Sequence, residues 1–216
     1  MKKLKFSPQE ILKKINRTVE KHQKEFGEIL SQMTYERIVH NNPAADNRTA
    51  YEYIYAENDS ALREAFANYK VKLEKGEKKI VELDKQFQEF KENNDYWLES
   101  DSLYEALSVK HNNDYWPMWK DEVDKNLYNP STEHPQEVLD LRKDELKADY
   151  SEEIEYYQFI QFIAFIQKQD TKTYVQNKKM QTIADAQVAF SDRDYWANQA
   201  YFLPGYSLGV PPDAFS

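Results

Sequence analysis

Glycine is scarce in this chain, and that scarcity limits how many tight turns the backbone can make. Only four glycines occur among the 216 residues, whereas an average usage of about 7% would place about 15. Two of the four, Gly205 and Gly209, fall within the last 12 residues. The rest of the chain is rich in Lys, Glu and Gln, which favour helices. The sequence therefore predicts a mostly α-helical chain of long helices.

Apolar side chains recur at spacings of three and four residues along much of the chain, which is typical of amphipathic helices. We expect one helix from Ser7, a mostly helical stretch over residues 51–90 with a break near Gly76, a helix over 135–148 and another from Ser151. Between these elements we expect loops or turns at residues 41–48, 112–119 and 129–132, and a helix cap at 93–95.

Residues 154–166 are apolar on most sides of the predicted helix, with Phe and Ile predominating. Such a pattern is typical of a helix surrounded by other protein segments. We expect it to be the most buried helix of the chain. Docking of a partner helix on this stretch is the less favoured alternative.

Residues 180–190 are the one stretch that reads as a β-strand, with Ile183, Val188 and Phe190 as its apolar positions. A single strand cannot pair its own backbone groups or bury both of its faces. The pattern therefore indicates that the strand pairs with segments outside this chain, as part of a larger domain, or that its partner strands in this chain cannot be recognised from the sequence.

Composition excludes several classes of function. The formal net charge of −9 argues against a nucleic-acid partner. No cysteine is present, so thiol chemistry and disulfides are excluded. No apolar run approaches the ~20 residues of a membrane span, and the basic N-terminus lacks the apolar segment of a signal peptide. The four His show no metal-ligand spacing. We expect a soluble cytoplasmic protein without a cofactor or metal.

Asp192 and Asp194, together with Asp185, form an acidic group near the C-terminus. Two carboxylates at a suitable separation are the catalytic residues of most glycosidases. The favoured alternative is a turn at the end of the strand in which the Asp side chains cap backbone groups.

The four Trp residues offer a second candidate for sugar binding, because aromatic faces pack well on the apolar faces of sugar rings. Trp and Tyr are also common in protein cores. We expect Trp97, Trp116 and Trp119 to be core residues. Trp196 lies beside a candidate loop, and both roles stay open for it.

Residues 205–216 combine turn-forming glycines with a stiff Pro211–Pro212 pair and several aromatic side chains. Segments of this kind often close over a ligand. Asp213 and Ser216 are then candidates for contact with that ligand. A packed structural loop is the alternative.

Three strings near the C-terminus resemble the amylomaltases, which are 4-α-glucanotransferases. They are Asp185-Ala-Gln-Val-Ala-Phe-Ser, Trp196-Ala-Asn and Gly209-Val-Pro-Pro-Asp-Ala-Phe-Ser. A weaker similarity to the helical insertion of that family runs through the strings that begin at Tyr51, Leu62, Phe87, Leu103 and Tyr157. Together they cover residues 50–216. The chain departs from the family at Ala184, where Gly is usual, and its first two barrel strands are not visible before residue 50.

The resemblance implies a (β/α)8 TIM barrel with a helical insertion, in which chemistry lies on loops after the strands. Residues 50–180 would be the insertion, residues 181–216 an early barrel strand with a substrate-covering loop, and residues 1–49 an N-terminal segment of uncertain placement. By the same resemblance, the substrate-binding candidates are Asp185, Trp196, Asp213 and Ser216.

The family cuts an α-1,4-glucan and transfers the cut segment to another sugar through a covalent glycosyl-enzyme. An Asp nucleophile, a Glu acid/base and a second Asp carry this reaction. In the family order all three follow the segment that matches Ser216, so no catalytic residue maps onto this chain. We expect the chain alone to be inactive, with maltooligosaccharide or α-glucan as ligand and the rest of the barrel as a possible second chain. A non-catalytic helical protein that binds sugars or a partner is the alternative.

Overall fold

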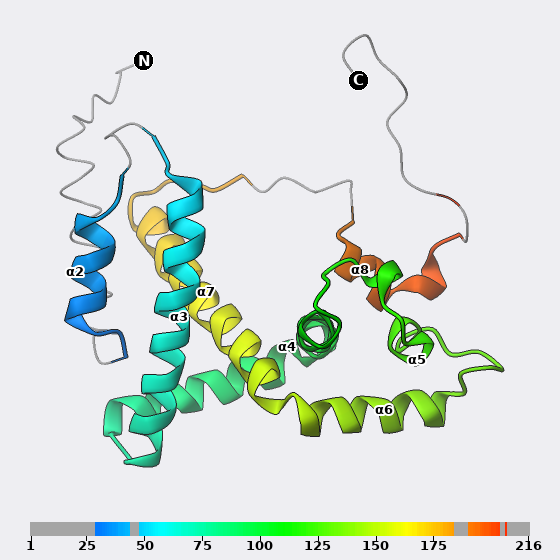
Figure 1. Ribbon diagram of the computed structural model, residues 1–216. Coiled ribbons are helices and arrows are strands. Elements are labelled where there is room, and N and C mark those ends of the chain that lie inside the picture. Colours follow the sequence, from blue (N-terminus) through cyan, green and yellow to red (C-terminus); the bar gives the residue numbers. More distant parts are fainter. Residues whose placement is uncertain (1–28, 44–47, 184–189, 204–205, 207–216) are drawn as a thin grey trace, which may run out of the picture. The chain divides into compact units, whose positions relative to one another are not determined.

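The computed structural model describes residues 29–43, 48–183, 190–203 and 206 (Figure 1). These residues are mostly α-helical and contain no β-strand, which confirms the predicted helical character for the described part. The chain divides into two compact units, Met1–Gln86 and Phe87–Ser216. They are called here the N-terminal unit and the C-terminal unit, and each has its own packing.

The described part of the N-terminal unit contains α2 (Gln32–His40), α3 (Tyr51–Glu74) and the start of α4 (Lys78–His111). Ser31 caps α2, because its side chain accepts a hydrogen bond from the Thr34 backbone N–H. Glu64 on α3 accepts the Ser31 backbone N–H at 2.8 Å. Side chains of α3 therefore hold the beginning of α2 in place.

The predicted break at Gly76 is confirmed, since this residue separates α3 from α4. Gly76 has φ +68°, a left-handed conformation that costs glycine little. Its N–H donates to Leu73 O at 2.9 Å, and the N–H of Glu77 donates to Lys72 O at 3.2 Å. This pair of bonds is a Schellman motif, which satisfies the last carbonyl groups of α3.

The cap predicted at residues 93–95 is wrong, because these residues lie inside the 34-residue helix α4. The Asn94 side chain donates to Phe90 O at 2.8 Å and accepts the Trp97 indole N–H at 3.1 Å. Both bonds stay within one helical face. Asn94 is thus accommodated in the helix interior, and buried apolar residues on either side, from Phe87 to Leu107, continue the helix.

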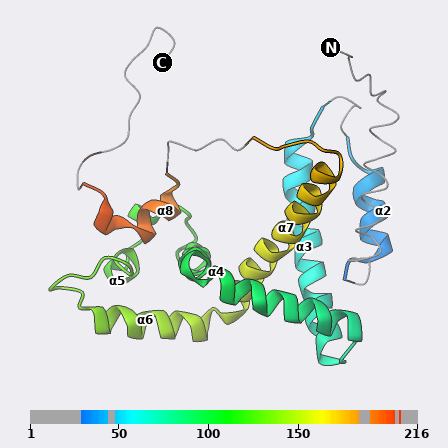
Figure 2. The ribbon, with the colours of Figure 1, turned by 180° about the vertical axis from the view of Figure 1, so that it is seen from behind.

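The C-terminal unit contains the rest of α4, followed by η1 (Trp116–Met118), α5 (Glu122–Lys125), α6 (Gln136–Asp149), α7 (Ser151–Asn177), α8 (Asp192–Ala197) and η2 (Gln199–Tyr201). The turn predicted at 112–119, the loop at 129–132 and the helices from 135 and 151 are confirmed. Figures 1 and 2 both place α8 beside α5.

Aromatic side chains join α4 to the first half of α7. The ring of Phe87 lies 5.9 Å from that of Phe159 and 5.2 Å from that of Phe162, and Phe90 lies 5.7 Å from Phe162. Burial of this kind contributes about 1.5–3 kcal/mol per large apolar side chain. The expected burial of α7 is confirmed for Ile154 to Ile163, whereas Phe165 is 41% exposed.

A second core cluster lies where α4, the end of α6, the start of α7 and α8 meet, with further members from the segments on either side of α5. Its buried members are Leu103, Tyr104, Ala106, Leu107, Trp119, Leu127, Leu146, Ile154 and Trp196. This cluster draws on residues nearly 100 positions apart in the sequence, and it is the part of the unit that fixes the position of α8.

Two predicted elements fall wholly or mainly outside the described residues. The helix from Ser7 lies in residues 1–28. Residues 184–189, the centre of the predicted strand, are also outside, while residues 180–183 and 190 carry no regular structure. The strand therefore stays a prediction.

Candidate functional site

Of the four predicted substrate-binding residues, the structure describes one. Asp185, Asp213 and Ser216 lie outside the described residues. Trp196 lies in α8, and its side chain is 0% exposed. The geometry of the candidate site is therefore that of α8 and the residues that hold it.

Local sequence explains why α8 begins at Asp192. The Ser191 side chain accepts the Asp194 backbone N–H at 3.1 Å, and Asp194 Oδ2 accepts the Ser191 backbone N–H at 3.1 Å. This reciprocal pair is a capping box. The interpretation of this acidic group as a capping device is thus confirmed for Asp194.

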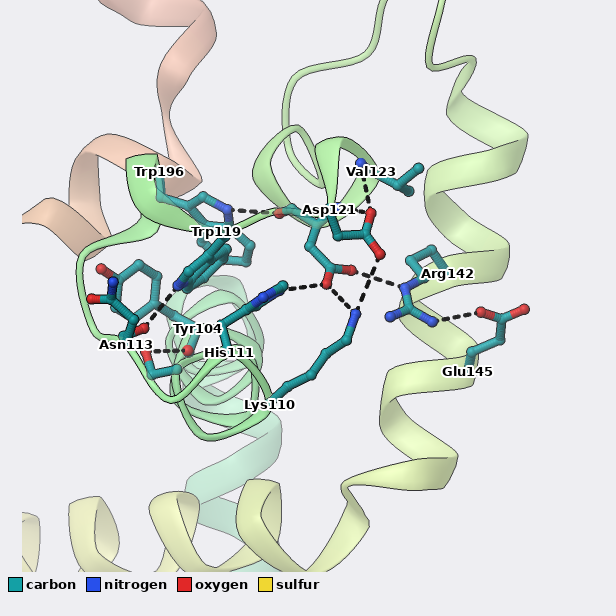
Figure 3. Close-up of polar contacts among 12 residues, drawn as sticks. Tyr104, Lys110, His111, Asn113, Trp119, Asp121, Val123, Arg142, Glu145 and Trp196 are labelled. Carbon is teal, nitrogen blue, oxygen red and sulfur yellow. Dashed lines mark hydrogen bonds and ion pairs between the residues drawn. The ribbon is translucent and has the colours of Figure 1, made fainter.

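Trp196 is the centre of an aromatic cluster (Figure 3). Its ring lies edge-on to those of Tyr104, Trp119 and Tyr128, with centroid distances of 5.4, 5.8 and 5.1 Å. Figure 3 shows Tyr104 and Trp119 beside it. Its indole N–H donates to Asp124 O at 3.0 Å, so its one polar atom is satisfied. Stacking of Trp196 on a sugar stays a prediction, and it would require this cluster to open.

The other three Trp residues differ in burial. Trp119 is 2% exposed and donates its indole N–H to Asn113 O at 2.8 Å, as expected of a core residue. Trp97 and Trp116 are half-buried. The core prediction is therefore confirmed most fully for Trp119.

Asp124, on α5 directly beneath Trp196, carries a carboxylate that is 0% exposed. Its oxygens accept hydrogen bonds from Arg142 Nε at 2.9 Å, from His111 Nε2 at 2.8 Å and from Lys110 Nζ. Because a carboxylate can only accept, Nε2 of His111 is the protonated nitrogen. A buried carboxylate is costly unless it is paired and hydrogen-bonded, and here three donors from two other helices meet that condition.

Neighbouring groups shift the pKa values of Asp121 and Arg142 in favour of their charged forms. Burial alone would raise the pKa of the Asp121 carboxyl, but the Asp124 backbone N–H and Lys110 outweigh burial and lower that pKa. Burial would lower the pKa of Arg142, yet its bonds to Asp124 and Glu145 raise it. The His111 ring stacks on Trp119 with centroids 5.1 Å apart, which joins the charged group to the aromatic cluster (Figure 3).

A second charged group lies around Arg193, one turn of α8 before Trp196, and both side chains contact Tyr104. Its Nη1 donates to the Tyr157 hydroxyl at 2.5 Å and lies 3.5 Å from Asp101 Oδ2, and its Nη2 pairs with Glu105. The guanidinium also lies over the Tyr104 ring, 5.5 Å from its centroid. Asp101 and Glu105 are one helical turn apart on α4, so they face Arg193 together.

Burial controls the acid–base properties around Arg193. It raises the pKa of Asp101 and of Glu105, and the nearby charge of Arg193 only partly opposes it. Burial likewise raises the pKa of Tyr104 to about 12. Burial thus favours the neutral forms of these groups, and the charge of Arg193 favours the ionised forms of the two carboxylates.

Sequence reasoning singled out Asp192, Asp194 and Trp196 but expected a turn where α8 lies. It missed Asp124, Arg142 and the partners of Arg193. No short motif joins these positions: Asp124 and Arg142 are 18 residues apart, and Arg193 and Glu105 are 88 apart. The one local signal was Asp121, a favourable helix N-cap directly before α5.

The geometry supports a structural role for these carboxylates. A retaining glycosidase needs one carboxylate free to attack and one protonated, about 5 Å apart, whereas Asp124, Asp101 and Glu105 are each engaged with cationic side chains. Among the described residues, no three His, Asp or Glu side chains are grouped so as to bind a metal ion. In the same residues, every helix is too short or too polar to span a bilayer.

Comparison with known proteins gives a consistent result. A family model described as 4-alpha-glucanotransferase matches residues 6–216. The 4-alpha-glucanotransferase of Synechocystis sp. is 30% identical over 183 residues, which cover 81% of this chain and 33% of that protein. The 4-alpha-glucanotransferases of Clostridium butyricum and Thermus thermophilus are 30% and 29% identical, and the matched parts cover 79% and 78% of this chain. No solved structure matches.

The chain spans about a third of the length of these relatives, since the matched parts are 33%, 33% and 32% of them. The resemblance drawn from the C-terminal strings is thereby confirmed at the level of the family.

Proposed function

This chain belongs to the 4-alpha-glucanotransferase family, and on that premise we propose that it forms part of an enzyme that transfers α-1,4-glucan segments between maltooligosaccharides by a retaining mechanism. The chain matches only 33% of the length of its Synechocystis relative, so the proposal concerns only the role of these residues within the enzyme. We propose that their role is to position a segment that binds the glucan.

The observation that carries this proposal is the anchoring of α8. Trp196 is fully buried among three aromatic rings, and its indole bonds to Asp124 O. Gln199, just after α8, donates to Lys125 O at 2.7 Å. The helical body thus holds residues 191–199 firmly, directly before the segment 205–216 that resembles the family's substrate loop.

We assign the glucan contacts themselves to Asp185, Asp213 and Ser216, with Trp196 supporting the segment from within the core. In this proposal the helices over residues 50–180 are the insertion of a (β/α)8 barrel, and residues 181–216 contribute a barrel strand and its loop. Residues 1–49 form a separate N-terminal segment. The mostly helical structure supports the assignment of the insertion.

We further propose that the 216-residue chain binds glucan but does not transfer it, because the buried carboxylates near α8 are all engaged with cations. A second chain would supply the rest of the barrel and its catalytic carboxylates. The proposed location is the cytoplasm.

Two measurements test this proposal. The purified chain is incubated with maltotriose, with the Thermus thermophilus relative as the positive control, and glucose release is followed over time. Binding of maltoheptaose is measured by titration calorimetry. We expect binding without release of glucose. Release of glucose would overturn the proposed inactivity, and absence of binding would overturn the positioning of a glucan segment.

Restoration of transfer tests the second chain. Proteins that co-purify with the tagged 216-residue chain are identified and assayed with maltotriose. The proposal expects a partner that carries the missing carboxylates and restores glucose release. A chain that purifies alone, with no activity recovered by any co-expressed neighbour, would contradict it.

A further inference from the structure

Arg193 is the only basic residue of α8, whose sequence is DRDYWA. Its two neighbours in the helix, Asp192 and Asp194, are exposed. The face that α8 turns toward α4 meets Asp101 and Glu105, which are half-buried. Arg193 is therefore the side chain of α8 that supplies a positive charge to these two carboxylates.

Like charges also act on the two acidic side chains of α4. Asp194 raises the pKa of Asp101, and Asp101 in turn raises the pKa of Glu105, in both cases after the larger effect of burial. Arg193 is the group that opposes both effects. Its charge, paired with both carboxylates, therefore favours the contact between α8 and α4.

The shape of the guanidinium also matters. Separate nitrogens of Arg193 reach Asp101 and Glu105, and one of them also donates to the Tyr157 hydroxyl at 2.5 Å. The planar group lies over the rings of Tyr104 and Tyr157, with centroid distances of 5.5 and 5.0 Å. A lysine ammonium carries the same charge but cannot make this forked and stacked arrangement.

From these contacts we infer that Arg193 is a positioning residue for glucan binding: it fixes α8 against α4 and α7 and so sets where the segment after η2 begins. This inference rests on the proposed function, in which that segment contacts the glucan. Trp196 packs α8 into the apolar core, whereas Arg193, one turn earlier on the helix, ties it to the acidic side chains of α4.

The test uses three variants of the 216-residue chain and maltoheptaose as the probe. Arg193→Met removes the charge and the fork, and Arg193→Lys keeps the charge alone. Arg37→Met is the matched control, because Arg37 also pairs with a partly buried glutamate, Glu57, but lies in the N-terminal unit. Affinity is measured by calorimetry well below the lowest unfolding midpoint of the set.

We expect R193M to weaken maltoheptaose binding by about tenfold or more, because small displacements of positioning groups have effects of this size. R193K should fall between R193M and the wild type, and R37M should stay within about twofold of the wild type. Hydrogen exchange should become faster in residues 192–202 of R193M, with the amides of α6 unchanged.

The possible failures are distinct. If the wild-type chain does not bind maltoheptaose, the proposed function fails, and this inference fails with it. If the wild type binds and R193M binds equally well, the inference alone is overturned. A purely stabilising role would lower the unfolding midpoint of R193M without changing its affinity where it is folded, and that result would also overturn it. Should R193M not fold, the affinity of R193K decides the question, because equality with the wild type contradicts the need for the fork.

Discussion

Replacing Asp124 by Asn should lower the stability of the C-terminal unit by about 3 kcal/mol, although the two side chains have nearly the same shape. The substitution removes the negative charge that three donors surround (Figure 3). It also places an amide NH2 where the carboxylate accepts hydrogen bonds from Arg142 and Lys110, which can only donate. The Trp196 indole bond is to the backbone of Asp124, so the aromatic cluster is left intact.

The expected loss of stability follows from how exposed the partners of Asp124 are. Removing one member of a buried ion pair costs about 3–5 kcal/mol, because it leaves an uncompensated charge. The side chains of Lys110 and Arg142 are 24% and 20% exposed, so they recover part of their hydration. This recovery places the cost at the lower end of the range. Asn fills the volume of Asp, so no cavity adds to it.

Urea unfolding followed by tryptophan fluorescence is the appropriate assay. All four Trp residues lie between positions 97 and 196, so the signal reports on the C-terminal unit. With a slope of about 2 kcal/mol per molar urea, a loss of about 3 kcal/mol moves the midpoint down by about 1.5 M.

The control is Asp144→Asn, the same chemical change at an exposed position of α6. Its stability should stay within about 0.5 kcal/mol of the wild type. If D124N unfolds at the same urea concentration as D144N, the three donors do not depend on the charge of Asp124, and the reasoning about this buried carboxylate is refuted.

Three further predictions concern the stability of contacts within each unit. Trp196→Phe keeps an aromatic ring but leaves Asp124 O without its donor, so it should cost about 1–3 kcal/mol in urea unfolding followed by circular dichroism; an unchanged midpoint would contradict this. For Glu99, burial raises the pKa but Lys147 and other donors lower it further, and a lowered pKa in the folded state gives stability that is lost as pH falls through that pKa. The wild type should therefore lose more stability than Glu99→Gln between about pH 5 and about pH 3, and parallel pH profiles would argue against the pairing. Gly76→Ala should lower the thermal stability of the N-terminal unit by about 1 kcal/mol through its φ of +68° alone, since an added methyl group meets no atom within 4 Å; Gly76→Asn should cost less.

Much of the helical fold could be predicted because it depends on local patterns. Apolar spacing and the scarcity of glycine predicted the long helices, and Gly76 marked the turn between α3 and α4. The same local reasoning was wrong at residues 93–95, where polar side chains resembled a cap. There the Asn94 side chain bonds back to Phe90 O, and packing of the flanking apolar residues outweighs the weak preference of Asn for helix ends.

The candidate site was predictable in part. Trp196 and the two Asp residues adjacent to Arg193 in the sequence, Asp192 and Asp194, stood out as local features. The resemblance of this part of the chain to the family is confirmed. The carboxylate of Asp124 did not stand out, because its three partners come from α4 and α6 and share no sequence spacing with it. Only the folded packing of those helices brings the charges together.

The long sequence separation between α8 and its contacts has a consequence for the order of folding during synthesis. The indole of Trp196 bonds to a residue made 72 positions earlier, and Gln199 to one made 74 positions earlier. Helices α4 to α7 leave the ribosome first, since domains fold from the N-terminus as they are made. Until α8 follows, the rings of Tyr104, Trp119 and Tyr128 lack the side chain that covers them. The nascent chain therefore presents an open aromatic surface for about 70 residues of synthesis, which is a site where a chaperone would bind.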